Sequence, residues 1–199
     1  MIVRNMRQHS QNAEVQQQGC NCLYNLAYVP DNKVKIREEG GIEVILEALR
    51  QHSGHAMVQQ HGCNALGSLA FSNADNKVKI GEEGGIEVIV EALRQHSGHA
   101  GVQEQGCLAL ACLANEGNIA AAGGIEAILQ AMRQHPTHAN VQEYGCWSLG
   151  NIGWSDPQLQ KQIKQAGAEA TVQAAMAAPN ATADTKNWGG ELLEKLKKV

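Results

Sequence analysis

The chain carries the segment DNKVKIREEGGIEVILEALRQHS at residues 31–53 and repeats it almost letter for letter, as DNKVKIGEEGGIEVIVEALRQHS, at residues 75–97. A looser copy, NIAAAGGIEAILQAMRQHP, occupies residues 118–136. Around these copies, Gly-Cys pairs begin at positions 19, 62, 106 and 145, and Arg-Gln-His triplets begin at positions 7, 50, 94 and 133. Both markers advance by 43, 44 and 39 residues. Two independent markers with one period indicate a tandem repeat.

Each repeat contains the signals of three helices. Asp31-Asn32 and Asp75-Asn76 are predicted to cap a short first helix, because their side-chain oxygens can accept backbone N–H bonds. Gly-Gly pairs at 40–41 and 84–85 then permit the left-handed backbone of a sharp turn. A second helix is predicted over 42–49, ending at Arg50, where a cation is favourable beside the helix dipole. A third, longer helix is predicted over 58–70, and the glycine that recurs at position 62 and its equivalents predicts a close helix contact.

Composition supports a helical protein. Hydrophobic residues make up 43% of the 199 residues and aromatic residues only 4%, so the core must consist of Leu, Ile, Val and Ala. Such a core suits stacked small helices better than a β-sandwich. The formal net charge is −4, which argues against a basic face for nucleic acid or an anionic membrane, and no apolar stretch is long enough to span a bilayer.

The repeat pattern resembles the armadillo repeat family. The resemblance rests on VQQHGCNALGSLA (58–70), VQEYGCWSLGNIG (141–153) and the DNKVKI…GGIEVI segments, and it covers the whole chain. It implies an all-α fold, a right-handed α-solenoid of three-helix units in a single domain over residues 1–199. We expect four units, at 31–71, 75–115, 116–154 and 156–197, after a partial unit at 1–28. The last unit is degenerate, and its lysine-rich end is polar, as the terminal cap of a solenoid requires.

The cysteines and histidines are predicted to be structural. Four cysteines occupy one position of the third helix in successive units: Cys20, Cys63, Cys107 and Cys146. Stacked helices lie about 10 Å apart, beyond the ~7 Å Cα limit of a disulfide, so we expect reduced, buried thiols. His-x-x-His pairs at 52/55, 96/99 and 135/138 could bind Zn²⁺ or Ni²⁺, but no further ligand completes a site. We expect instead that the first His of each pair ends one helix and the second begins the next.

The sequence contains no recognisable catalytic constellation. Nucleophile-elbow, Walker, zinc-protease and dinucleotide motifs are all missing from it. We therefore predict a protein that is not an enzyme and has no catalytic residues, no cofactor and no metal site.

The resemblance places the binding surface on the third helices. Peptide-binding armadillo proteins carry there a Trp and, four residues later, an Asn that can hydrogen-bond the main chain of a peptide. Only Trp147 and Asn151 form the complete pair. The other predicted peptide-binding residues lie on the same stripe: Asn21, Asn25, Tyr28, Asn64, Ser68, Phe71, Leu108, Asn115, Tyr144 and Trp154. Trp188 is expected to plug the C-terminal end instead.

This predicted groove is nearly uncharged, with only Glu14, Glu104 and Glu143 near it, at the helix starts. Neither the acidic groove of importin-type proteins, which holds basic nuclear localisation signals, nor the basic groove of β-catenin-like proteins is supported. We predict a non-enzymatic protein interaction scaffold that binds an extended peptide or a partner's helix, in the cytoplasm or nucleus, without contacting nucleic acid or membrane.

Two alternatives belong to other classes. Residues 2–7 read as a second helix with no first helix to cover it, which favours a structural role, as part of a longer protein or in end-to-end pairing into a homodimer. RNA binding of the Pumilio kind, through Asn21, Tyr24 and Asn25, is disfavoured by the acidic balance of the chain.

Overall fold

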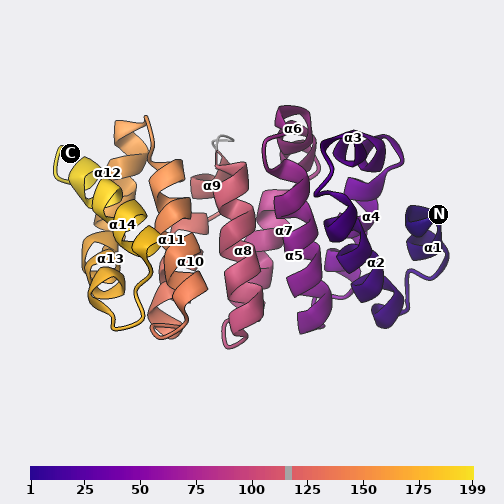
Figure 1. Cartoon of the computed structure of the whole chain (residues 1–199), viewed down its shortest axis with the longest axis horizontal. Coiled ribbons are helices and arrows are strands. Elements are labelled where there is room, and N and C mark those ends of the chain that lie inside the picture. The colour runs from indigo at the N-terminus through magenta and orange to yellow at the C-terminus, as the bar shows by residue number, and fades with distance from the viewer. Residues whose placement is uncertain (115–117) are drawn as a thin grey trace.

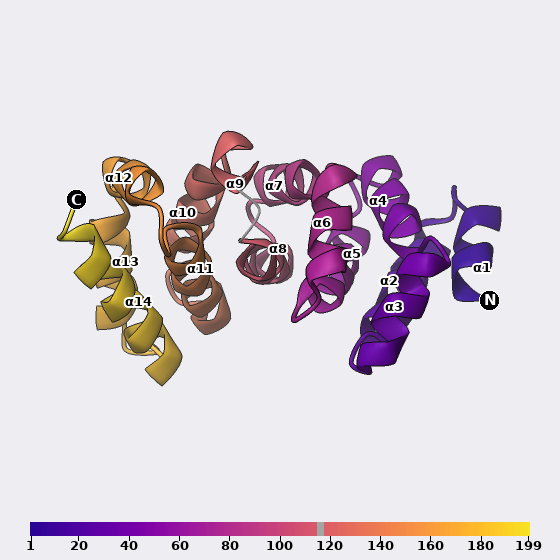
Figure 2. The same ribbon diagram turned by 90° about the horizontal axis from the view of Figure 1, so that it is seen from above.

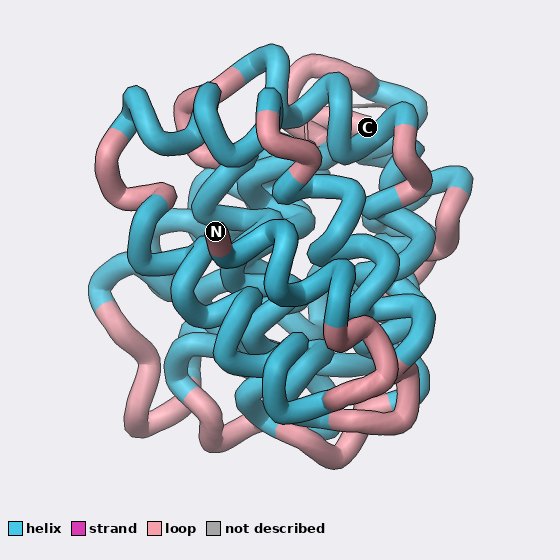
Figure 3. Tube along the Cα trace, turned by 90° about the vertical axis from the view of Figure 1, so that its right-hand side faces the viewer, coloured by secondary structure: helices cyan, strands magenta, loops and turns pink. Residues whose placement is uncertain are grey.

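A computed structural model describes residues 1–114 and 118–199 and shows one row of stacked helices (Figure 1). The described residues form 14 α-helices and no strand. The two termini lie at opposite ends of the row (Figure 2), and the view from the N-terminal end shows only helices and their connecting loops (Figure 3). The all-α solenoid predicted from the repeats is confirmed.

The helices fall into three sets that alternate along the chain. The first helices are short: α3 (Pro30–Glu38), α6 (Ala74–Glu82), α9 (Asn118–Ala121) and α12 (Pro157–Gln165). The second helices are α1 (Ile2–Gln8), α4 (Gly41–Gln51), α7 (Gly85–Gln95), α10 (Gly124–Gln134) and α13 (Ala168–Ala177). The third helices are α2 (Ala13–Leu26), α5 (Ala56–Ala70), α8 (Ala100–Leu113), α11 (Ala139–Ile152) and α14 (Ala183–Leu196). Third helices pack side by side in chain order, and in Figure 2 the ends of the row bend toward them.

Several helix starts differ from the prediction. Helix α3 begins at Pro30, and α6 is capped by Asn73, whose Oδ1 accepts the N–H of Asn76 at 3.0 Å. The predicted caps at 31–32 and 75–76 were therefore wrong, and these residues lie inside the first turn. Helix α5 begins at Ala56, earlier than predicted, because Nδ1 of His55 accepts the N–H of Val58 at 3.4 Å. The predicted left-handed turn is confirmed, with φ of 76° at Gly40.

A buried glutamine joins the third helix to the second helix in four of the repeats. The Nε2 of Gln59 donates to the carbonyl oxygens of Leu49 and His52, at 2.9 and 3.0 Å. The last carbonyls of a helix have no intrahelical partner, so this amide satisfies two of them. The same pair of bonds is made by Gln16, Gln103 and Gln142. We call this arrangement the glutamine clamp.

The recurring Arg-Gln-His triplets bond to the neighbouring repeats on both sides. Nη2 of Arg94 donates forward to the carbonyl of Ala122 at 3.2 Å, near the end of the next first helix. Nε2 of His96 lies 2.6 Å from the carbonyl oxygen of Ser53 in the preceding repeat. Arg50 likewise donates forward, to the carbonyl of Glu83, so its role extends beyond the end of its own helix.

The recurring glycine of the third helix packs against the second helix, as predicted. A Cβ added at Gly62 would lie 2.4 Å from Cδ2 and 2.8 Å from Cγ of Leu49, which is fully buried. The equivalent glycines face Met6, Leu93 and Met132 in the same way: Gly19, Gly106 and Gly145. Gly67 has a different neighbour, since an added Cβ there would lie 3.1 Å from the backbone Cα of Ala109 on α8.

No helix within residues 1–114 and 118–199 has both the length and the apolar character needed to cross a membrane.

We predict opposite effects of one substitution at two third-helix glycines. Gly62→Ala should lower the free energy of unfolding by about 1–3 kcal/mol, because the added methyl overpacks Leu49. Gly150→Ala should raise it by up to about 1 kcal/mol, because a Cβ there meets no atom within 4 Å and alanine favours the helix. Urea denaturation of both variants measures the difference. Stabilisation by both substitutions would show that Gly62 is not in a tight contact.

A second prediction concerns the thiols, all six of which are free. Five are buried, and burial raises the pKa of Cys63 and Cys107 to about 12, which suppresses the reactive thiolate. Only Cys22 is exposed. Labelling of the native protein with a maleimide should therefore modify Cys22 rapidly and the other five only after denaturation. Recovery of disulfide-linked peptides from alkylated native protein would contradict the assignment.

Candidate functional site

Two adjoining pockets lie along the third helices. One, of about 610 Å³, is lined by residues of α2, α5, α8 and α11, and the other, of about 470 Å³, continues from α8 and α11 to α14. Phe71, Cys112 and Trp147 line both pockets. The two pockets therefore form one continuous hollow, which we call the third-helix groove.

Most of the predicted site residues line this groove. Nine of them do so: Tyr28, Asn64, Ser68, Phe71, Leu108, Tyr144, Trp147, Asn151 and Trp154. Asn21 and Asn25 lie on α2 outside both pockets, and Nδ2 of Asn25 bonds the carbonyl of Asn21 at 2.9 Å within the same helix. Asn115 lies outside the described residues.

Aromatic rings form the wall of the groove at its C-terminal end. The half-buried ring of Trp147 stacks on Trp188, with centroids 6.1 Å apart and an interplanar angle of 27°. Trp188, which packs against the core from the last helix, lines the groove as well. The sequence contained the signal, because Trp188 directly precedes Gly189 just as Tyr144 precedes Gly145. Beyond them Trp154 is 59% exposed, with Nζ of Lys195 3.4 Å from its ring centroid.

The other end of the groove carries a pair of tyrosines. The rings of Tyr24 and Tyr28 meet edge to face, with centroids 5.2 Å apart, and their hydroxyl groups are hydrogen-bonded to each other. This bond is the largest cause of a raised pKa of Tyr24. One hydroxyl of the pair donates to the other, so the second hydroxyl is left with a hydrogen that it can donate to a ligand.

Amide side chains in the groove are partly engaged with the protein. Nδ2 of Asn151 donates to the carbonyl of Ala111 at 3.0 Å, which ties α11 to α8 and leaves its Oδ1 without a hydrogen bond to any described residue. Nε2 of Gln105 donates to Glu104 at 2.9 Å, whereas its Oε1 is buried and has no partner within the described chain. A buried acceptor without a donor costs about 1–3 kcal/mol.

The start of the third helices forms an acidic edge. Glu104 lines the groove. Burial is the largest cause of a raised pKa of Tyr144, and the negative charges of Glu104 and Glu143 raise this pKa further. Oε2 of Glu104 lies 3.8 Å from Nε2 of His138, and Oε2 of Glu143 accepts a hydrogen bond from Thr182 at 2.7 Å. Of the three acidic residues expected near the groove, Glu104 lines it, whereas Glu14 and Glu143 lie outside both pockets.

The opposite edge carries lysines that the sequence analysis missed. Lys33 of α3 and Lys77 of α6 line the groove at the ends of the third helices. Burial raises the pKa of Cys112 to about 11, and the charges of Lys77 and Lys33 oppose that rise. The expectation of a nearly uncharged groove was therefore wrong at this edge, because these side chains come from the first helices and lie outside the third-helix stripe.

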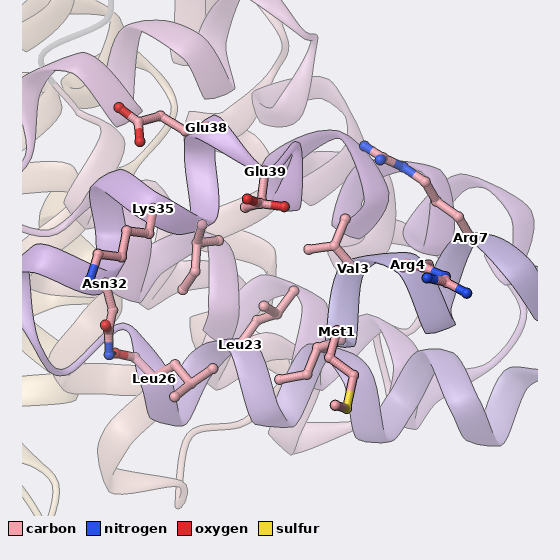
Figure 4. A pocket seen from close by; sticks show the side chains of 12 residues that line it. Met1, Val3, Arg4, Arg7, Leu23, Leu26, Asn32, Lys35, Glu38 and Glu39 are labelled. Atoms are coloured by element: carbon pink, nitrogen blue, oxygen red, sulfur yellow. The ribbon is translucent and has the colours of Figure 1, made fainter.

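A separate hollow of about 460 Å³ lies at the N-terminal end of the row (Figure 4). Val3 and Leu23 form its apolar floor, with Leu26, which is 41% exposed, beside them. Charged side chains surround this floor: Arg4, Arg7, Lys35, Glu38 and Glu39. The face of α1 expected to lack a covering helix borders this hollow.

The histidine pairs have structural partners. Nε2 of His52 lies 2.7 Å from the carbonyl oxygen of Ser10, and Nδ1 of His55 caps α5. The prediction that the first His ends one helix and the second begins the next is confirmed. In the part of the chain that the structure describes, no three His, Cys, Asp or Glu side chains gather as metal ligands.

Comparisons with known proteins agree with this architecture. A family model described as LRRK2 ARM repeat matches residues 1–121. The crystal structure of an engineered protein superposes with a TM-score of 0.88 at 22% identity, over 100% of this chain and 80% of that chain. A second engineered protein superposes with a TM-score of 0.84 at 27% identity, over 98% of this chain and 47% of that chain. A designed armadillo repeat protein in complex with the peptide (KR)4 superposes with a TM-score of 0.83 at 17% identity, over 98% of this chain and 80% of that chain. The search of curated proteins found no match.

Proposed function

Because this chain belongs to the LRRK2 ARM repeat family of armadillo proteins, we propose that it is a non-enzymatic scaffold that binds an extended peptide in the third-helix groove. The observation that carries this proposal is the continuity of the groove across α2, α5, α8, α11 and α14. Stacked helices advance by about 10 Å, which an extended chain covers in about three residues. Each third helix can thus offer contacts to one short segment of the peptide.

The side chains of the groove support this use. Rings at Tyr28, Phe71, Trp147 and Trp154 provide apolar slots for alternate side chains, and Asn64, Gln105 and Asn151 provide amide groups for a main chain. The designed armadillo neighbour holds a peptide on the same fold. The proposal keeps the division of the chain into repeat units, with a partial unit at 1–28 followed by units at 31–71, 75–115, 116–154 and 156–197.

End-to-end association is a second candidate, favoured by the apolar floor of the N-terminal hollow (Figure 4). Light scattering on the purified chain distinguishes the two. A strict monomer at high concentration would reject association and leave peptide binding intact.

The proposed groove predicts distinct effects for its two tryptophans on a peptide selected by display against the wild-type chain. Trp154→Ala should weaken binding about thirtyfold, as a hot-spot aromatic does. It should change the free energy of unfolding by no more than about 1 kcal/mol, because the ring is largely exposed and its cation–π contact with Lys195 is worth little at an exposed site. Trp147→Ala should weaken binding and also destabilise the fold, since Trp147 stacks on Trp188. Calorimetric titration and denaturant melts measure both effects.

Asn25→Ala is the matched control, because Asn25 lies on a third helix outside the groove. Its affinity for the selected peptide should stay within about twofold of the wild type, as expected for a surface change. Failure to select any peptide, or unchanged affinity in both tryptophan variants, would reject the groove as the binding site.

A further inference from the structure

We propose that the third-helix groove selects a peptide with an acidic side chain, whose carboxylate pairs with Lys33 and Lys77. This inference rests on the proposed function and specifies the class of peptide that the groove takes.

The first observation is the environment of Lys33. Its side chain lines the groove, yet the residue is only 8% exposed. Nζ donates to the carbonyl of Phe71 and lies 5.6 Å from the centroid of that ring, and no described carboxylate pairs with it. A buried charge is costly unless it is paired, and a neutral carbonyl with an aromatic ring compensates it only in part. Consistent with this, burial lowers the pKa of Lys33.

The second observation is that Lys77 repeats this position. Lys33 and Lys77 follow Asn32 and Asn76 in the two near-identical segments, so they occupy the same place on α3 and α6. Both ammonium groups act on the pKa of Cys112, which lines both pockets of the groove. Lys77 also has no described ion-pair partner. Two cations without a described ion-pair partner therefore line the two adjoining pockets that share Cys112.

A carboxylate at this point would lie far from the acidic edge. Glu104 precedes Cys112 by eight residues on α8, which corresponds to about 12 Å along the helix. A negative side chain beside Cys112 thus meets Lys33 and Lys77 with little repulsion from Glu104, whereas a lysine or arginine there would meet two like charges. Such repulsion excludes wrong ligands as effectively as attraction selects right ones.

The rings beside the lysines indicate the neighbouring residue of the peptide. Phe71 is 53% exposed and, with Trp147, lines the groove on both sides of the junction between the pockets. An apolar side chain next to the carboxylate would cover these rings. The expected ligand is therefore an extended segment in which Asp or Glu lies beside a large apolar residue.

The test selects a random displayed peptide library against the purified full chain. Asp or Glu should be enriched at one position beside an apolar residue. Synthetic forms of the consensus peptide, with the acidic residue or its amide, are then titrated into the wild type, Lys33→Gln and Lys77→Gln. Each lysine variant should weaken the acidic peptide about tenfold or more, as loss of one partner from a desolvated charge pair does, and should affect the amide peptide much less.

Lys35→Gln is the matched control. It removes the same charge from the same helix, but Lys35 lines the N-terminal hollow instead of the groove (Figure 4). Its affinity for the acidic peptide should equal that of the wild type. Equal losses in Lys35→Gln and Lys77→Gln would overturn the proposal, because they would indicate a general effect of net charge.

The outcomes separate this inference from the proposed function. Selection of peptides without acidic enrichment, or with Lys and Arg enriched, would overturn the inference and leave groove binding intact. Selection of no peptide at all would reject both. If Lys33→Gln unfolds the chain, Lys77→Gln decides, because Lys77 is less buried than Lys33.

Discussion

The stack depends on one constraint: the last carbonyl groups of each second helix have no partner within that helix and need hydrogen-bond donors from elsewhere. In four repeats the glutamine clamp satisfies two of them from the third helix, and the recurring glycine follows that glutamine by three residues, as Gly62 follows Gln59. Residues three apart lie on one face of a helix, so the amide and the missing side chain meet the second helix together. The glycine brings the helices close enough for the amide to reach, and Leu49 fills the remaining space. A substitution of the glycine would therefore also weaken the hydrogen bonds of the glutamine three residues before it.

The same geometry places the groove. Asn64 follows Gly62 by two residues, and Trp147 follows Gly145 by two, a rotation of about 200° around the helix. Residues at this position therefore point away from the second helix, toward the side on which the pockets lie. Forward bonds from arginines such as Arg94 and backward bonds from histidines such as His96 then fix the register of neighbouring repeats. The packing of the glycine face against the second helix therefore also determines which face of each third helix lines the groove.

The fold was predictable because the same pattern of residues recurs in successive repeats of the chain. The helix starts were harder, since Asn73 and Asn76 can both cap a helix and only the structure shows that Asn76 is buried, with its amide on the carbonyl of Leu69. The shared helical stripe identified nine residues that line the groove, although Asn21 and Asn25 on the same stripe lie outside both pockets. The lysine edge could not be predicted from that stripe, because Lys33 reaches the groove from a first helix and bonds Phe71, 38 residues further along the chain. Contacts between helices of different repeats depend on how the repeats stack, which periodicity alone does not specify.

A division of labour between the helices follows from this placement. In the proposed complex, the rings and amides of the third helices contact the peptide along its length, whereas Lys33 and Lys77 of the first helices meet the charge of one side chain. The designed neighbour in complex with (KR)4 shares only the fold with this chain, at 17% identity. Under the proposal, the residues at the edges of the stack, and not the stack itself, decide the charge of the peptide that is bound. In the proposed complex, the path of the peptide depends on Trp147 and Asn151, and its charge depends on Lys33 and Lys77.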